Sequence, residues 1–312
     1  MDLTIQILTI NNDKTIEKTI NSILPLDAQI QLIDMGSSDN TLDICKSLHI
    51  KTIHTTETNR SIARNLFLEK IKTKYIMYIN PWEALVQGHD IIKSYKDSSL
   101  RVRIFQENIL NKEVRFWNKD LKYKFINPVF EYVKNAKGSL ENVIFYSSPD
   151  DDFDYKLELV DKWLKEEPLS SQPFYYKAFL MLTRKRYDEF LSFIDQYLFL
   201  NPTIEMSTIM SRYYFSMVQI YHKKKMNIAL KNLAICLAVN PCMAEFWCLA
   251  ADGYFFLMKE IRHAETLYEN AINLGSKRRL NDEWPMDITK YEEYPKKFLE
   301  SCRKIKEKIL IK

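Results

Sequence analysis

One corner from a strand to a helix constrains the fold more than any other part of the sequence, and it lies in residues 31–41, Gln-Leu-Ile-Asp-Met-Gly-Ser-Ser-Asp-Asn-Thr. Leu32 and Ile33 belong to a short apolar run that is typical of a buried strand. Gly36 and the polar residues after it favour a tight turn and a helix N-terminus. From Thr41 onward, apolar residues at spacings of three and four predict an amphipathic helix.

The same alternation of strands and helices continues along the first part of the chain. Further strands are predicted over 3–10, 51–54, 75–79, 101–107 and 143–146. Helices of about ten residues between the early strands imply a parallel sheet with right-handed crossovers. We therefore predict an α/β domain with a Rossmann-like, mostly parallel sheet.

Asp34 ends the predicted strand of the corner, directly before the turn that leads into the helix. In open α/β sheets, ligands bind at the carboxyl ends of the strands, and a helix N-terminus favours anionic groups such as phosphates. A carboxylate at this place could accept a hydrogen bond from a base or from a sugar hydroxyl. The alternative is a corner without a ligand, in which the aspartate only caps the turn.

The composition excludes several classes of protein. The sequence has only five glycines, so it holds neither a glycine-rich dinucleotide fingerprint nor a P-loop. A net charge of +4 gives little support to a nucleic-acid partner, and we expect none. No apolar run approaches the roughly 20 residues of a membrane span. Five scattered cysteines and an N-terminus without signal-peptide features favour reduced thiols and a cytoplasmic protein.

Several motifs follow one another up to about residue 135 in an order that resembles family 2 glycosyltransferases. They are Ile-Leu-Thr-Ile-Asn-Asn, Asn21-Ser22-Ile23, the Asp-x-Gly-Ser-x-Asp-x-Thr stretch that starts at Asp34, Ala63-Arg64-Asn65, Arg115-Phe116-Trp117 and Asn127-Pro128-Val129-Phe130-Glu131. The stretch that starts at Asp34 is the most specific of them. The resemblance implies the GT-A fold and a nucleotide-sugar donor, for which a UDP-linked sugar is favoured.

The resemblance also implies roles for individual residues. Asp34 would contact the uracil or the ribose of the donor, and Thr9, Asn11 and Ser37 would line the nucleotide pocket. Arg64 would lie near the diphosphate, where a guanidinium can bind two oxygens at once. The expected activity is the transfer of a sugar from the donor to an acceptor nucleophile.

The chain departs from the family pattern where the strand over 75–79 ends. The family has Asp-x-Asp-Glu there, and these carboxylates hold Mg²⁺ or Mn²⁺ against the diphosphate. Here Asn80 and Trp82 replace the two aspartates, and Glu83 alone keeps its charge. A metal ion held by Asn80, Glu83 and the donor phosphates would be bound weakly. Phe130 likewise replaces a histidine of the family.

These departures leave three interpretations open. Catalysis could be independent of a metal, with Arg64 or lysine side chains neutralising the diphosphate. Glu83 could be an acid–base group or a residual metal ligand, and Glu131 is a second candidate for the base that an inverting transfer requires. The chain could instead be a retired transferase, a non-catalytic scaffold that binds proteins through its helical repeats.

Helical periodicity replaces the strands after residue 154. The segment from Pro241 to Gly275 spans about 34 residues, the period of a tetratricopeptide repeat, with about one residue inserted between its two helices. A looser unit covers residues 207–239. We predict a GT-A-like nucleotide-sugar-binding domain over 1–148, tetratricopeptide-like helical repeats over 154–276 and a C-terminal capping helix over 277–312.

The second half of the chain bears on the acceptor. Repeats of this class usually bind a peptide or a protein partner, so a polypeptide acceptor or an acceptor presented by a partner is favoured. The basic, amphipathic tail is typical of an end cap, and a helix on a membrane surface is the alternative. The aspartates at 150–152 fit a solvated linker and helix start better than a metal site.

Overall fold

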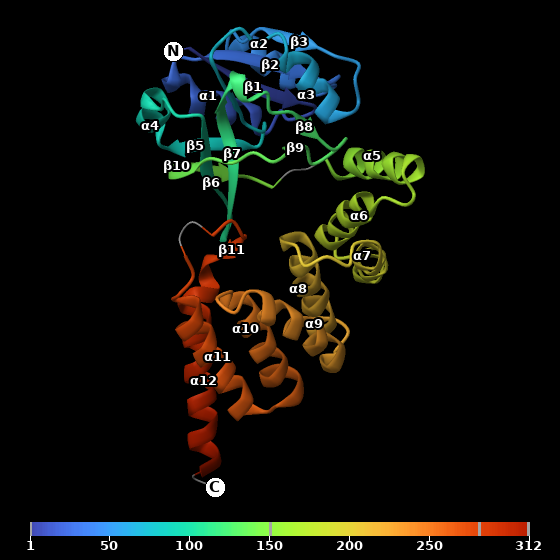
Figure 1. Ribbon diagram of the computed structural model, residues 1–312, viewed down its shortest axis with the longest axis vertical. Coiled ribbons are helices and arrows are strands. Elements are labelled where there is room, and N and C mark those ends of the chain that lie inside the picture. Colours follow the sequence, from blue (N-terminus) through green and yellow to red (C-terminus); the bar gives the residue numbers. More distant parts are fainter. Residues whose placement is uncertain (1, 150–151, 280–281, 311–312) are drawn as a thin grey trace. The chain divides into compact units, whose positions relative to one another are not determined.

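The chain folds into two compact units. A computed structural model describes residues 2–149, 152–279 and 282–310. Its contacts divide the chain into Met1–Trp163 and Leu164–Lys312. The strands of the sheet occupy the blue-to-green part of the chain in Figure 1, and the second unit is built almost entirely from helices.

The first unit is organised around one mixed sheet, whose strands run in the spatial order β3-β2-β1-β4-β7-β6-β10-β5. Their bounds are β1 (Leu3–Thr9), β2 (Gln29–Asp34), β3 (Thr52–His54), β4 (Tyr75–Tyr78), β5 (Glu83–Gln87), β6 (Ser99–Gln106), β7 (Ile109–Asn118) and β10 (Ser139–Ser147). The first four strands pair in parallel, as the alternation of strands and helices predicts. Strand β7 is antiparallel to β4 and β6, β5 is antiparallel to β10, and β6 and β10 are parallel.

The other elements that begin in the first unit are the helices α1 (Ile16–Ile23), α2 (Thr41–Ser47), α3 (Arg60–Leu68), α4 (His89–Ser94) and α5 (Phe153–Glu166) and the short helical segments η1 (Leu24–Leu26) and η2 (Lys119–Leu121). Two further strands, β8 (Phe125–Ile126) and β9 (Tyr132–Val133), form a small antiparallel pair. Asn59 caps α3, because its side chain accepts a hydrogen bond from the backbone N–H of Ile62. Pro25 lies in η1, which follows α1 directly.

Strand β1 lies at the centre of the core and is buried along its whole length. Ile5 and Ile7 pack against Ile16 and Ile20 of α1 on one face of the sheet. Other apolar side chains form the core of the opposite face, among them Leu8, Ile33, Ala63 and Phe67. A continuous apolar run such as Ile-Leu in a parallel sheet predicts a strand that is covered on both faces, and β1 is such a strand. Because both strands end in this buried core, the loops that follow β1 and β2 start from fixed positions.

The second unit consists of antiparallel helix pairs. Its elements are α6 (Ser171–Thr183), α7 (Tyr187–Leu200), α8 (Met206–Tyr221), α9 (Met226–Val239), α10 (Ala244–Asp252), η3 (Gly253–Met258), α11 (Ile261–Gly275), β11 (Met286–Asp287), η4 (Ile288–Tyr291) and α12 (Glu293–Leu310). Helices pair as α6 with α7, α8 with α9 and α10 with α11, and α12 packs against α11. The short π-helical segment η3 follows α10, and such a segment accommodates an extra residue within a helix.

A buried carboxylate links α10 to three other helices of this unit. Asp252 is fully buried and accepts hydrogen bonds from the phenol groups of Tyr268 at 2.6 Å and Tyr294 at 2.8 Å. Tyr221 donates a third hydrogen bond to the same carboxylate. The three tyrosines come from α11, α12 and α8, so the side chain of Asp252 connects three helices through hydrogen bonds.

The predicted fold class is confirmed: an α/β domain with a mostly parallel, mixed sheet precedes an all-α unit of helical pairs. Within the described residues, no helix has both the length and the apolar character that crossing a membrane requires.

Candidate functional site

Two loops at the carboxyl ends of β1 and β2 are joined by hydrogen bonds. The backbone N–H of Asn11 donates to Oγ of Ser37 at 3.0 Å, and the N–H of Ser38 donates to Oδ1 of Asn11 at 2.8 Å. One turn further along, the N–H of Asn12 donates to Oγ1 of Thr41 at 2.8 Å. Asn11 adopts a left-handed backbone conformation with a φ of 51°, which asparagine tolerates better than most residues. The loops therefore form one preorganised corner above the sheet.

Asp34 lies at the base of this corner, with only 1% of its surface exposed. Its carboxylate accepts hydrogen bonds from the backbone N–H groups of Gly36 at 3.0 Å and Ser37 at 3.1 Å. His54, at the end of β3, places Nδ1 3.2 Å from the same carboxylate. These contacts fix the orientation of the carboxylate, and each carboxylate oxygen has lone pairs for more than one donor.

The predicted pocket residues Thr9, Asn11, Asp34 and Ser37 are thus brought together, but they differ in exposure. Asn11 is exposed and Ser37 is half-buried. Thr9 is fully buried, and its hydroxyl donates to Oδ1 of Asn12 at 2.9 Å, so its side chain supports the loop from within. The sequence did not single out His54, whose only signal is its place at the end of the strand beside β2.

A second cluster of buried charges centres on Glu131. Nε of Arg64 donates to its Oε1 at 2.7 Å, and Nε of Arg60 donates to its Oε2 at 2.9 Å. Arg64 is fully buried, and its other nitrogen atoms donate to Oδ1 of Asn80 at 3.0 Å and to Oε1 of Gln6 at 3.4 Å. The predicted diphosphate ligand Arg64 therefore lies inside a network of protein acceptors.

The charges around Glu131 decide its protonation. Burial by itself raises the pKa of this carboxyl group, but the guanidinium groups of Arg60 and Arg64 outweigh it and hold the pKa at about 2. A carboxylate with so low a pKa is a weak base at neutral pH. Its strongest effect in this arrangement is to align the two arginines.

Glu83 forms a third buried pair, at the first residue of β5. Its Oε1 accepts a hydrogen bond from Nη2 of Arg115 at 2.8 Å. Asn80 donates to the same carboxylate twice, from its backbone N–H at 2.9 Å and from its side chain at 3.1 Å. Burial raises the pKa of Glu83, and Arg115 opposes that shift. Nε and Nη1 of Arg115 have no hydrogen-bond partner among the described residues, and the guanidinium lies over the ring of Tyr78.

Lys156 enters the same region from the first turns of α5. Its side chain is 8% exposed, and its ammonium lies 2.6 Å from Oδ1 of Asp152. The centroids of the Trp82 and Phe130 rings each lie 4.9 Å from Nζ of Lys156. Asp152 also lies 3.6 Å from Nη1 of Arg60. The only signal for Lys156 in the sequence is its spacing of four residues from Asp152.

The aspartates at 150–152 were predicted to form a solvated linker and a helix start, and only Asp152 belongs to the described residues. Asp150 and Asp151 lie outside the described residues. Asp152 precedes α5, and its backbone carbonyl accepts the first helical hydrogen bond from the N–H of Lys156. Its side chain pairs with Lys156 and Arg60 and faces the buried cluster.

Residues 4–81 match the family model Glycosyl transferase family 2. No curated protein matches the sequence. Among solved structures, Staphylococcus aureus TarS 1–349 in complex with UDP-GlcNAc is similar with a TM-score of 0.40 and 12% identity, over 84% of this chain and 92% of that chain. MamA from Desulfovibrio magneticus RS-1 has a TM-score of 0.38 and 16% identity, over 51% and 84% of the two chains. The tetratricopeptide domain of Aspergillus fumigatus Sgt2 has a TM-score of 0.35 and 15% identity, over 46% and 82%.

The family match confirms the predicted resemblance to family 2 glycosyltransferases in the first part of the chain, and helical pairs follow it, as predicted. The family 2 segment contains β1 to β4, the corner around Asp34, and Arg64. Glu83 and Glu131 lie beyond its last residue. The likeness to family 2 glycosyltransferases thus covers the corner around Asp34 and Arg64 but neither Glu83 nor Glu131.

The residues at the metal position of family 2 do not fit a divalent ion. The side-chain oxygen of Asn80 accepts a hydrogen bond from Arg64, Glu83 pairs with Arg115, and Trp82 offers no ligand atom. Among the residues that the structure describes, no group of three or more His, Cys, Asp or Glu side chains could hold a metal ion. Mg²⁺ and Mn²⁺ therefore take no part in the chemistry that we derive for this site.

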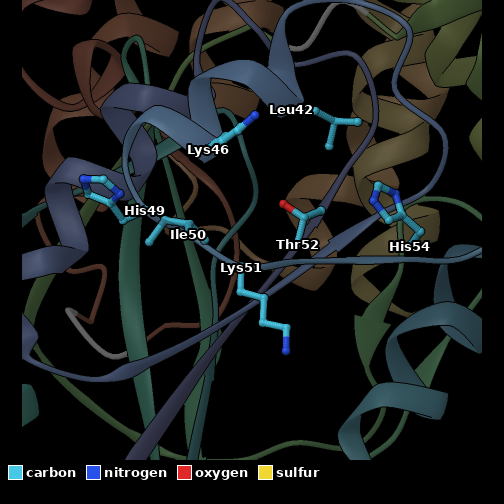
Figure 2. A pocket seen from close by; sticks show the side chains of 7 residues that line it. All are labelled: Leu42, Lys46, His49, Ile50, Lys51, Thr52 and His54. Carbon is cyan, nitrogen blue, oxygen red and sulfur yellow. The ribbon is translucent and has the colours of Figure 1, made fainter.

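A surface pocket of about 390 Å³ lies along α2 and β3 (Figure 2). The side chains of Lys46 and Lys51 extend away from one another in Figure 2, so the two charges do not converge on one point. The lining residues are Leu42, Lys46, His49, Ile50, Lys51, Thr52 and His54.

Proposed function

We propose that the first unit binds a nucleotide-sugar, with a UDP-linked sugar as the favoured donor, and transfers the sugar to an acceptor. One observation carries this proposal: a buried, oriented carboxylate, Asp34, stands at the carboxyl end of a parallel strand inside the segment that matches family 2. Parallel strand ends of this kind are where open α/β sheets bind nucleotides. Because hydrogen bonds already join the two loops, ligand binding would cost little conformational entropy of these loops.

Asp34 would accept a hydrogen bond from the imide N–H of the base or from a ribose hydroxyl. Its two contacts with backbone N–H groups hold the carboxylate in place. Asn11 and Ser37, which are the exposed and half-buried members of the corner, would contact the same nucleoside. Thr9 would act indirectly, through the hydrogen bond of its hydroxyl to Asn12.

The two candidate catalytic carboxylates suit different roles. Glu83 has a raised pKa, so it is the better proton acceptor of the pair. It would need to exchange its contact with Arg115 for the acceptor. Glu131, with its pKa of about 2, is assigned to positioning Arg60 and Arg64. Arg64 would then stabilise the diphosphate through the field of its buried charge.

The repeat unit supports a polypeptide acceptor or an acceptor presented by a protein partner. Large apolar side chains are exposed on it, and the most exposed are Leu169, Phe199 and Ile204. Exposed apolar side chains on a helical repeat are suited to contacts with a peptide or a protein.

A second function is favoured by the buried charges themselves. Asn80 and Trp82 replace metal ligands, and Arg64, Glu83 and Glu131 are all engaged in internal ion pairs. Such an arrangement also suits a non-catalytic scaffold that keeps the transferase fold and binds proteins through its repeats.

Calorimetric titration with UDP and with a panel of UDP-sugars separates the two functions. The transferase proposal expects binding in wild type and a loss of about tenfold or more in Asp34→Ala, because the base or ribose loses its acceptor. Asp43→Ala, an exposed position on α2, is the matched control and should bind as wild type does. Wild type that binds none of these ligands, nor other nucleotide-sugars, would favour the scaffold.

A further inference from the structure

The ammonium group of Lys156 is held between two aromatic rings. Trp82 and Phe130 each place a ring centroid 4.9 Å from Nζ, within the range of a cation–π contact. The lysine side chain is 8% exposed, so the contacts form in a region of low dielectric, where they are stronger than at the surface.

These two rings stand at the two positions where the chain departs from the family pattern. Trp82 replaces the second carboxylate of Asp-x-Asp-Glu, and Phe130 replaces a histidine. Carboxylate and imidazole groups are ligands for divalent cations, whereas aromatic rings attract an ammonium. Residues 82 and 130 are far apart in sequence, yet both replacements meet on one cation, Lys156.

We propose that Lys156 takes the place of the divalent cation and supplies the positive charge that faces the donor diphosphate. This inference rests on the proposed function, because it assumes that a nucleotide occupies the corner at Asp34. The lysine brings one charge and three N–H donors on a side chain of this chain itself, so the site requires no metal.

Asp152 marks the place that the diphosphate would occupy. Its carboxylate lies 2.6 Å from Nζ of Lys156 and 3.6 Å from Nη1 of Arg60, so it bridges two cations as a phosphate group would. An entering diphosphate would exchange with this carboxylate, one anion for another. Burial and the neighbouring Arg60 lower the pKa of Lys156, to about 7, and an additional anion favours the charged ammonium.

A purely structural lysine would make the same contacts but would leave nucleotide affinity unchanged. The readout must therefore be the part of the affinity that the phosphates contribute. Uridine and UDP share the nucleoside that Asp34 is proposed to bind, and only UDP carries the diphosphate. The ratio of their dissociation constants reports the contribution of the diphosphate, and the part of it that is lost in Lys156→Met is the part that we assign to Lys156.

The experiment is calorimetric titration of the full chain with uridine and with UDP, in EDTA and in Mn²⁺. Wild type should bind UDP about tenfold or more tightly than uridine in EDTA, with little change on adding Mn²⁺. Lys156→Met should lose most of this preference for UDP, with uridine affinity unchanged. Lys156→Arg, which keeps the charge, should retain most of the difference, and Lys165→Met, an exposed lysine of the same helix, should behave as wild type.

Several results would overturn the inference. They are a Lys156→Met variant that keeps the full preference for UDP, a wild type that binds UDP no more tightly than uridine, and a wild type in which Mn²⁺ tightens UDP binding about tenfold. If wild type binds uridine and UDP equally well, this inference alone is contradicted. If it binds neither ligand, the proposed function is contradicted as well. If Lys156→Met does not fold, Trp82→Leu replaces it: the loss of one ring should weaken UDP binding and spare uridine, and unchanged UDP binding contradicts the inference.

Discussion

Nε of Arg64 lies 2.7 Å from Oε1 of Glu131, and both side chains are almost completely buried. The two residues are separated by 67 positions in the sequence, and each was predicted to act on the substrate. In the folded chain they pair with one another, and Arg60 pairs with the second oxygen of the carboxylate. The pair ties α3 to the segment between β8 and β9.

Replacing Glu131 by glutamine should destabilise the first unit. The amide is neutral, so it would leave the guanidinium groups of Arg60 and Arg64 buried without their counter-charge. Removing one partner of a buried ion pair costs about 3–5 kcal/mol. Urea unfolding followed by circular dichroism measures the loss, and Glu17→Gln, on the exposed surface of α1, is the control for a change at a free carboxylate. A Glu131→Gln protein as stable as that control would contradict the assignment.

The same carboxylate should make the first unit sensitive to acid. The pKa of Glu131 falls from 4.5 to about 2 on folding, so its contribution is complete above pH 4.5 and is lost as the pH falls toward 2. A shift of this size corresponds to about 3 kcal/mol. The free energy of unfolding of wild type should therefore drop over this interval by more than that of Glu131→Gln. Parallel pH profiles for the two proteins would show that the pair contributes nothing.

Local pattern was enough to predict the corner around Asp34. A buried strand, a turn with Gly36 and an amphipathic helix are each encoded by neighbouring residues, so the fold of this part follows from the sequence. The parallel pairing of the first four strands was predictable for the same reason. Strands β5 and β7 were not predicted, because the chain returns antiparallel there and the residues around Glu83 gave no separate signal.

The partners of the buried charges could not be predicted in this way. Glu131 and Arg60 are 71 residues apart in the sequence, and Arg115 and Glu83 are 32 residues apart. No short stretch of sequence therefore contains both members of either pair. Lys156 was overlooked because a lysine early in a helix is normally solvated. Its burial depends on Trp82 and Phe130, which are brought to it only by the folded chain.

Neutralising Asp152 should strengthen nucleotide binding. If its carboxylate occupies the place of a phosphate group, Asp152→Asn removes a competing anion from Lys156 and Arg60. The affinity for UDP should rise several-fold while that for uridine stays constant, as titration of both ligands would report. A fall in UDP affinity would mean that Asp152 orients Lys156 for the ligand and does not compete with it.

Asp252 should be the most sensitive polar residue of the repeat unit. Its carboxylate accepts hydrogen bonds from Tyr221, Tyr268 and Tyr294, which belong to three helices around α10. Asp252→Ala would leave three buried phenol groups without an acceptor and should cost about 2–4 kcal/mol, since an unsatisfied buried polar group loses its full solvation. Asp252→Asn keeps one carbonyl oxygen and should cost less. The free energy of unfolding, monitored by urea titration of the full chain, should fall in the order wild type, Asp252→Asn, Asp252→Ala. Equal stability of the alanine and wild-type proteins would mean that packing of the apolar side chains alone holds α8, α11 and α12 together.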